Sequence, residues 1–146
     1  MGLLERIRSG GPPELGAARL PVERHHSSPA EIASRVAAGA SVLPLVRELL
    51  DQAQRTPDAT VVALLAERPV LTGSAEADAL LGGIAELLAV TRGTAAPNWV
   101  QDPERFLDRF WFVSDVPGFR AVALAQTPVS LKRRGVLWPR RSLQRV

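Results

Sequence analysis

Apolar residues recur every three or four positions through the first half of the chain, which is the period of an amphipathic helix. The first such stretch begins at Ser28-Pro29, a capping residue followed by a proline, and continues to Gly39. The second begins after Ser41 and ends near Thr56-Pro57. The pattern therefore predicts two short helices in succession.

The next two segments are also predicted to be helical. Residues 58–68 hold a run of apolar side chains that Asp58 can cap and Pro69 must end; a buried strand is the alternative, and we favour the helix. Residues 76–92 form the clearest helix, with acids in the first turn, one apolar face and a glycine as stop signal. Gly82-Gly83 inside it costs roughly 1 kcal/mol per glycine relative to alanine. Either another helix approaches closely there or the helix is locally weak.

The last third of the chain is rich in aromatic residues, and six of the chain's seven lie between Trp99 and Phe119. Asp102-Pro103-Glu104 is typical of a helix start. The apolar positions that follow predict one helical face, made of Phe106, Leu107, Phe110 and Trp111. Residues 119–126 are ambiguous.

Thr127-Pro128 predicts a further short helix, which Gly135 closes before a last basic segment. Residues 1–27 are rich in turn-forming residues, which predicts a flexible arm. We therefore expect one compact, mainly α-helical domain at residues 28–146. A short strand or hairpin in the C-terminal third stays open. The sequence shows no convincing internal repeat and no alternating βαβ pattern.

The chain contains no cysteine, which excludes a disulfide framework, a thiolate zinc site, an iron–sulfur cluster and a cysteine nucleophile. Its first residues carry charges too early for a signal peptide, and no apolar run approaches the length of a membrane span. We therefore expect a cytoplasmic protein without a membrane partner.

The net charge of +3 hides an asymmetry along the chain. The last fifteen residues carry six basic side chains and no carboxylate, whereas the remainder carries 12 basic and 15 acidic side chains. A localised basic end can meet nucleic acid or an acidic protein surface.

Groups able to carry catalysis or hold a metal are few and poorly arranged. The two histidines are the adjacent pair His25-His26, whose side chains project in different directions. The carboxylate pairs Glu76 with Asp78 and Asp102 with Glu104 lie where helix starts favour acids. No serine lies in a nucleophile elbow, and no glycine-rich stretch has phosphate-loop spacing. We expect a protein that is not an enzyme and holds no cofactor or metal.

The basic segment of residues 132–141 combines arginines with an aromatic side chain, as nucleic-acid binders also do. The alternative is a solvated helix end whose arginines oppose the helix dipole while the tryptophan packs into the aromatic cluster. No complete helix-turn-helix, ribbon or single-strand platform is visible. The candidate partner-binding residues are Arg133, Arg134, Trp138, Arg140 and Arg141.

Six stretches of the chain match a known family in their order and spacing. They are residues 31–39 (EIASRVAAG), 45–51 (LVRELLD), 78–86 (DALLGGIAE), 96–100 (APNWV), 103–108 (PERFLD) and 128–136 (PVSLKRRGV). From about residue 28 to its end, the chain resembles small antitoxin-like proteins of actinobacteria and other GC-rich bacteria. These proteins are sometimes fused behind a helix-turn-helix and are encoded beside nucleotidyltransferase-like toxins.

The resemblance implies a non-enzymatic antitoxin that neutralises its cognate toxin by holding it in a complex. Nucleotidyltransferases place acidic metal ligands in a cleft, to which an arginine-rich end can supply counter-charge. We therefore expect the four arginines among the candidates at the toxin surface, with Trp99 and Trp111 supporting the fold. No DNA-reading helix-turn-helix is seen before residue 28, unlike in the fused members. The alternative function is a nucleic-acid-binding accessory or regulatory protein that uses the basic C-terminus.

Overall fold

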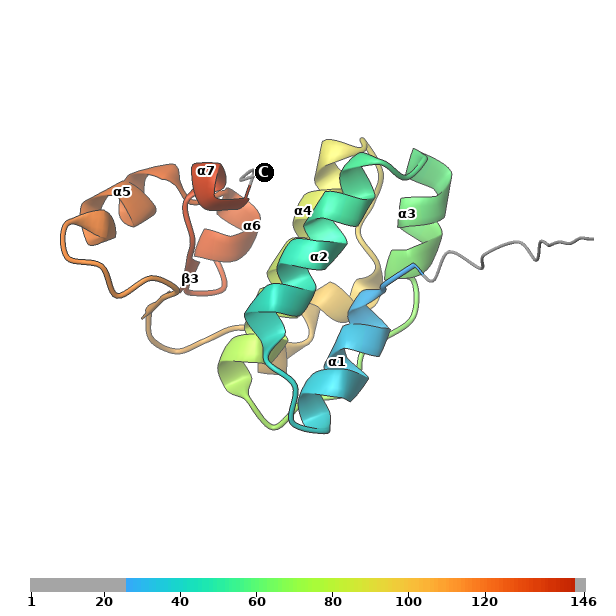
Figure 1. Ribbon diagram of the computed structural model, residues 1–146, viewed down its shortest axis with the longest axis horizontal. Coiled ribbons are helices and arrows are strands. Elements are labelled where there is room, and N and C mark those ends of the chain that lie inside the picture. The colour runs from blue at the N-terminus through green and yellow to red at the C-terminus, as the bar shows by residue number, and fades with distance from the viewer. Residues whose placement is uncertain (1–25, 144–146) are drawn as a thin grey trace, which may run out of the picture.

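The computed structural model describes residues 26–143, and the first part of this region is a group of four packed helices (Figure 1). The helices are α1 (Pro29–Ala37), α2 (Val42–Gln54), α3 (Asp58–Leu65) and α4 (Ala75–Thr91). Their bounds confirm the four predicted helices, including the helical interpretation of the third segment.

Two of these helices begin at a serine whose side chain caps the first turn. The Ser28 hydroxyl accepts a hydrogen bond from the Glu31 N–H at 3.1 Å, and the Ser74 hydroxyl accepts one from the Ala77 N–H at 3.2 Å. Each bond satisfies an N–H group that has no acceptor within the helix. Ser41 precedes α2 without such a side-chain bond.

The rest of the described chain forms short elements linked by loops. They are the 3₁₀ turns η1 (Asn98–Gln101) and η2 (Pro103–Arg105), strand β2 (Trp111–Phe112), helices α5 (Phe119–Gln126) and α6 (Val129–Lys132), strand β3 (Val136–Leu137) and helix α7 (Arg140–Leu143). Helices α5 to α7 and strand β3 lie to the left of the four-helix group in Figure 1. The protein is therefore mainly α-helical, with a small two-stranded sheet in its C-terminal third.

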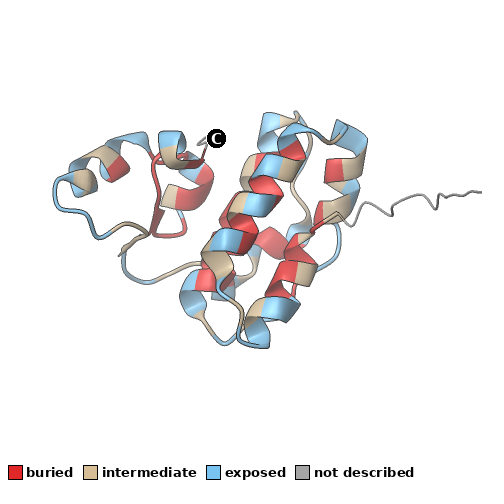
Figure 2. Cartoon of the chain, viewed as in Figure 1, coloured by how far each residue is buried: buried red, intermediate tan, exposed pale blue. Residues whose placement is uncertain are grey.

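Helix α4 joins the two parts of the molecule. It contacts α1, α2 and α3, and it also contacts η1, η2, α6 and β3. Its side chains Leu80, Leu81 and Ile84 have no exposed surface. Because neighbours surround the helix, its apolar residues occupy more than the one predicted face. Figure 2 shows buried residues concentrated where the helices face one another.

The glycine pair in α4 lies where other segments approach the helix. A Cβ atom on Gly83 would overlap the Leu131 side chain of α6. A Cβ atom on Gly82 would lie 3.1 Å from Arg134 Nε and 3.2 Å from Arg105 Cβ. Of the two explanations offered by the sequence, close approach of another helix is therefore confirmed.

The helix predicted after Asp102 is wrong. Helical geometry ends after the single turn of η2, and residues 106–110 form no regular helix. The backbone of this segment pairs with the chain that follows α6: the Leu107 N–H donates to the Arg134 carbonyl at 2.9 Å, and the Trp111 N–H donates to the Gly135 carbonyl at 2.8 Å. These long-range bonds replace the local bonds of a helix, so tertiary contacts override the local signal.

Strands β2 and β3 pair in parallel, with Trp111 opposite Val136 and Phe112 opposite Leu137. Parallel strands need a crossover connection, and here α5 and α6 form it. The pair is therefore not a hairpin. Each strand is only two residues long, which is too short to produce the alternating pattern by which a strand is recognised.

Most of the predicted arm, residues 1–25 with His25, lies outside the described residues, as do residues 144–146. Ser27 is described, and it is buried against α2. Its N–H donates to Gln52 Oε1 at 2.8 Å, and Gln52 Nε2 donates to the Ser27 carbonyl at 3.1 Å. The packed region thus includes the last residue assigned to the arm. Within residues 26–143, no helix is long and apolar enough to cross a membrane.

Candidate functional site

Arg134, one of the five candidate partner-binding residues, lies inside the protein and has no exposed surface. Its guanidinium donates to the Ser130 carbonyl and the Val100 carbonyl, each at 2.6 Å, and it pairs with the Glu86 carboxylate. Burial lowers the pKa of Arg134 from its ordinary value, and the hydrogen bond and charge of Glu86 act in the opposite direction. Arg134 therefore holds α4, η1 and α6 together and is not a surface anchor.

A second buried arginine, Arg105, was not singled out by the sequence. It donates to the Pro69 carbonyl at 2.9 Å and to the Asp78 carbonyl at 3.3 Å, and its guanidinium lies 4.8 Å from the centre of the Trp99 ring. Burial lowers the pKa of Arg105, while the nearby carboxylates of Asp78 and Asp102 raise it. The missed signal was the glycine pair of α4, because Gly82 makes room for both buried arginines.

Trp138 is also buried, with 2% of its surface exposed. The Arg47 guanidinium on α2 lies 5.2 Å from the centre of its ring. Trp138 is therefore part of the hydrophobic core and is not a surface residue. Trp99 is buried too, and its Nε1–H donates to the Leu65 carbonyl at 2.8 Å, whereas Trp111 is half-buried.

The other three candidates, Arg133, Arg140 and Arg141, are exposed. Arg133 donates to Gln101 Oε1 at 2.9 Å and lies 3.3 Å from Glu86 Oε1, so it is partly engaged within the protein. Arg141 lies 5.5 Å from the centre of the Phe119 ring. The structure thus divides the five candidates into three surface residues and two residues that serve the fold.

A surface groove lies between residues 107–110 and the end of α6; we call it the Phe110 groove. Its volume is about 320 Å³, and Phe110 is 61% exposed. It is lined by Leu107, Asp108, Arg109, Phe110, Lys132, Arg133 and Gly135. The sequence pattern placed Phe110 on the apolar face of a predicted helix, whereas the structure has no helix there and exposes Phe110 at this groove.

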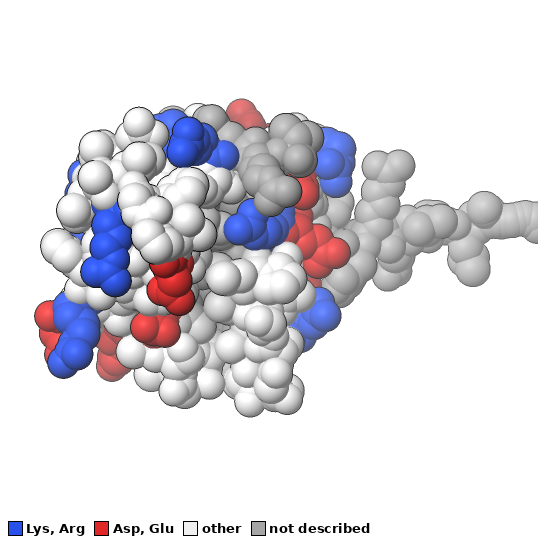
Figure 3. Space-filling view, turned by 60° about the vertical axis from the view of Figure 1, so that its left-hand side comes forward, with Lys and Arg blue, Asp and Glu red and all other residues white. Residues whose placement is uncertain are grey.

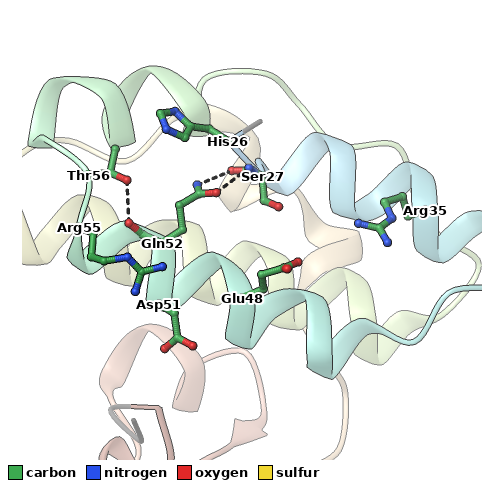
Figure 4. Close-up of a pocket in the computed structure, with 8 residues that line it drawn as sticks. All are labelled: His26, Ser27, Arg35, Glu48, Asp51, Gln52, Arg55 and Thr56. Atoms are coloured by element: carbon green, nitrogen blue, oxygen red, sulfur yellow. Dashed lines mark hydrogen bonds between the residues drawn. The ribbon is translucent and has the colours of Figure 1, made fainter. Parts of the chain in front are cut away.

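A larger hollow of about 560 Å³ lies between α1 and α2, with His26 at its rim (Figure 4). Its charged side chains are two arginines, Arg35 and Arg55, and two acids, Glu48 and Asp51. Figure 4 shows Gln52 bonded to Ser27 across the hollow. Because the four charges balance, the hollow does not select a ligand of one sign.

One carboxylate of each pair noted in the sequence, Asp78 and Asp102, is bound within the fold. Asp78 is buried and accepts hydrogen bonds from the Thr72 N–H and hydroxyl, both at 2.9 Å. Asp102 pairs with Arg68 on the surface and lies 3.8 Å from the guanidinium of Arg105. Across residues 26–143, no three potential ligands gather into a metal site.

Charge is divided between the two parts of the chain. Residues 26–104 carry ten acidic and five basic side chains, a net charge of −5, whereas residues 105–143 carry eight basic and two acidic ones, a net charge of +6. Figure 3 turns the C-terminal part forward and shows basic side chains spread over a largely uncharged face, with a smaller number of acidic side chains among them. We call the exposed side chains of residues 107–143 the C-terminal surface.

Comparisons with known proteins give this surface no precedent. No family model, no curated protein and no solved structure matches the chain. The antitoxin resemblance therefore rests on the six sequence stretches described above. A function for the C-terminal surface has to be argued from its own chemistry.

Proposed function

We propose that this chain is a non-enzymatic antitoxin that binds and neutralises a nucleotidyltransferase-like toxin through its C-terminal surface. One observation carries the proposal: this surface combines a net positive charge with large exposed apolar side chains. These apolar side chains are Phe110, Val116, Leu124 and Val129. Protein interfaces characteristically combine apolar contacts with aromatic and arginine anchors.

The charge of the C-terminal surface is complementary to an acidic partner. The resemblance implies a toxin whose cleft holds carboxylates for metal binding. The C-terminal part of the antitoxin would be attracted to such a cleft, and the net negative four-helix part would be repelled from it. This asymmetry would orient the two proteins during their encounter.

The positions of the arginines refine the expected contacts. Arg140 and Arg141 are exposed on α7, and Arg133 is exposed at the end of α6. Arginine suits this role because its planar guanidinium can donate two parallel hydrogen bonds to one carboxylate. We assign partner contact to these three residues. Arg134 and Trp138 support the proposal only indirectly, by fixing the segment that carries the three exposed arginines.

The test is co-expression of the affinity-tagged chain with the product of the gene encoded beside it. The proposal predicts that the two proteins elute together in size-exclusion chromatography. It also predicts that growth inhibited by the partner is restored when the chain is present. A partner that elutes separately and stays toxic would contradict the proposal.

A second arm of the experiment separates protein binding from capture through nucleic acid. The complex is treated with nuclease and chromatographed again at raised salt. A protein interface with an apolar centre should survive, because apolar contacts are not screened by salt. Loss of the complex under both treatments would show that nucleic acid had bridged the two proteins.

A further inference from the structure

We propose that the Phe110 groove binds single-stranded nucleic acid, with a base stacked on Phe110 and phosphates held by Arg109 and Lys132. This inference goes beyond the proposed antitoxin function and does not depend on it. It rests on three features of the groove: an uncovered aromatic ring, two cations that have no side-chain partner within residues 26–143, and walls fixed by backbone hydrogen bonds.

The first feature is the ring of Phe110. At 61% exposure it stands uncovered beside basic side chains. The nearby Phe106 makes a useful contrast, because the guanidinium groups of Arg133 and Arg134 lie 5.2 Å and 4.7 Å from its ring centre. Uncovered aromatic rings in cationic grooves are the stacking platforms of single-strand binders, since every base has a flat face.

The second feature is the pair of cations. Neither Arg109 nor Lys132 has an ion pair or side-chain hydrogen bond within the described part of the chain, whereas Arg133 is engaged with Glu86 and Gln101. The two free cations come from the two walls of the groove, residues 107–110 and the end of α6. Asp108 also lines the groove, and its carboxylate can accept a hydrogen bond from a base amino group or a ribose hydroxyl.

The third feature is that the groove is built before a ligand arrives. Residues 107 and 111 both donate backbone hydrogen bonds to the segment after α6, which anchors the Phe110 loop at its two ends. Gly135 has φ +84°, and a Cβ atom there would lie 3.1 Å from the Arg109 carbonyl oxygen. Only glycine therefore lets the two walls approach this closely.

Size and shape favour a nucleic-acid strand over an acidic peptide. A volume of about 320 Å³ falls at the small end of ligand sites, which suits a single nucleotide unit and not a duplex. An acidic peptide would use the cations but has no flat base to stack on the exposed ring of Phe110. A strand uses both, because its bases stack while its phosphates pair with cations.

The test is fluorescence anisotropy of the full chain with short labelled oligoadenylate and oligouridylate over a range of salt concentrations. With two phosphates held, log K should fall against log salt with a slope of about −1.4, since each phosphate of a single strand contributes about −0.7. Phe110→Ala should weaken binding on the order of ten-fold, and Phe110→Trp should retain it. Lys132→Glu should weaken binding and make the salt slope shallower.

Matched control variants carry the same kinds of change, a charge reversal and a truncation of an apolar side chain, at positions away from the groove. Arg35→Glu reverses a charge on α1, and Leu71→Ala truncates an exposed apolar side chain between α3 and α4, so neither should alter binding. Thermal melts of each variant verify that it is folded. Equal losses in the groove and control variants would overturn the inference, as would the absence of binding at low salt.

Competitors distinguish the source of the ligand. Unlabelled oligonucleotide should displace the probe, whereas duplex RNA, adenosine monophosphate and polyglutamate should compete much more weakly. Strong competition by polyglutamate, together with unchanged binding by Phe110→Ala, would make the groove a site for acidic peptides and overturn the assignment. Equal affinity for the mononucleotide would likewise overturn the assignment to a strand.

Discussion

At the scale of single residues, two buried arginines link the segments that meet at the centre of this protein. Arg105 and Arg134 both lie against Gly82, and each binds backbone carbonyls of neighbouring segments. A guanidinium is not deprotonated in proteins, so both positive charges are kept within the fold. Such charges are tolerated only while they are paired, and removing the partner leaves a costly unpaired charge.

This reasoning predicts the effect of Glu86→Gln, which removes the charge that Arg134 pairs with but keeps an acceptor of similar size. We expect the free energy of unfolding to fall by about 3 kcal/mol, the lower end for a buried pair, because the Glu86 side chain is 17% exposed. Urea denaturation measures the change. Glu76→Gln, at an exposed position of α4, is the control and should have almost no effect; a similar loss in both variants would contradict the role of Glu86.

A second residue-scale prediction concerns Gly83→Ala. Alanine favours a helix by about 1 kcal/mol over glycine, yet here its Cβ would overlap the Leu131 side chain. We expect a net destabilisation of about 1–3 kcal/mol from this overpacking. A double-mutant cycle with Leu131→Ala checks the cause, because the double variant should lose less than the sum of the two single losses. A stabilised Gly83→Ala variant would show that α6 does not press against α4.

At some single positions, burial could not be predicted from the sequence. Arg133 and Arg134 are neighbours with the same chemistry, yet one is exposed and the other has no exposed surface. Nothing local distinguishes the two residues, because the burial of Arg134 depends on contacts with Glu86 and Val100, which are distant in sequence. The Gly82-Gly83 pair did carry a usable signal, since its cost within a helix left two explanations, close packing or a locally weak helix, and the structure shows close packing.

Helices α4 and α5 differ greatly in the share of their residues that is buried. Helix α4 contacts most of the other elements of the described chain, whereas α5 has Ala123 as its one buried residue. A helix of eight residues with so little burial gains little from tertiary contacts. Local opening of α5 should therefore cost much less free energy than opening of α4.

Hydrogen exchange read by mass spectrometry tests this difference. We expect the backbone amides of residues 119–126 to exchange long before those of residues 79–89, because the latter can open only with most of the core. Residues 42–54 of α2 provide an internal reference with an intermediate number of contacts. Protection of α5 equal to that of α4 would contradict the packing described here.

The elements themselves were predictable where they were long. The helices between residues 29 and 91 followed from apolar periodicity, caps and glycine stops, all of which are local signals. The segment after Asp102 carried an equally good local signal, yet its backbone pairs with residues 134–137. Contacts over that distance leave no periodic trace. A short strand in the C-terminal third had been left open, but neither the position of β2 nor the Phe110 groove could be predicted.

At the scale of the whole molecule, charge and exposed apolar surface coincide in one region. Residues 105–143 carry the excess of basic side chains, and four of the seven large exposed apolar side chains lie there. The four-helix part has the opposite net charge. The two parts of the molecule therefore carry opposite net charges, and an acidic partner should approach it through the C-terminal surface.

The most direct test of the proposed function is the affinity of the proposed toxin partner, once purified, for two charge-reversed variants. One is Arg140→Glu with Arg141→Glu on α7, and the other is Arg35→Glu with Arg55→Glu, which makes the same change on the four-helix part. The proposed function predicts at least about a ten-fold loss of affinity for the α7 variant and an unchanged or only slightly reduced affinity for its control. Equal affinities for the two variants, or a larger loss for the control, would contradict it.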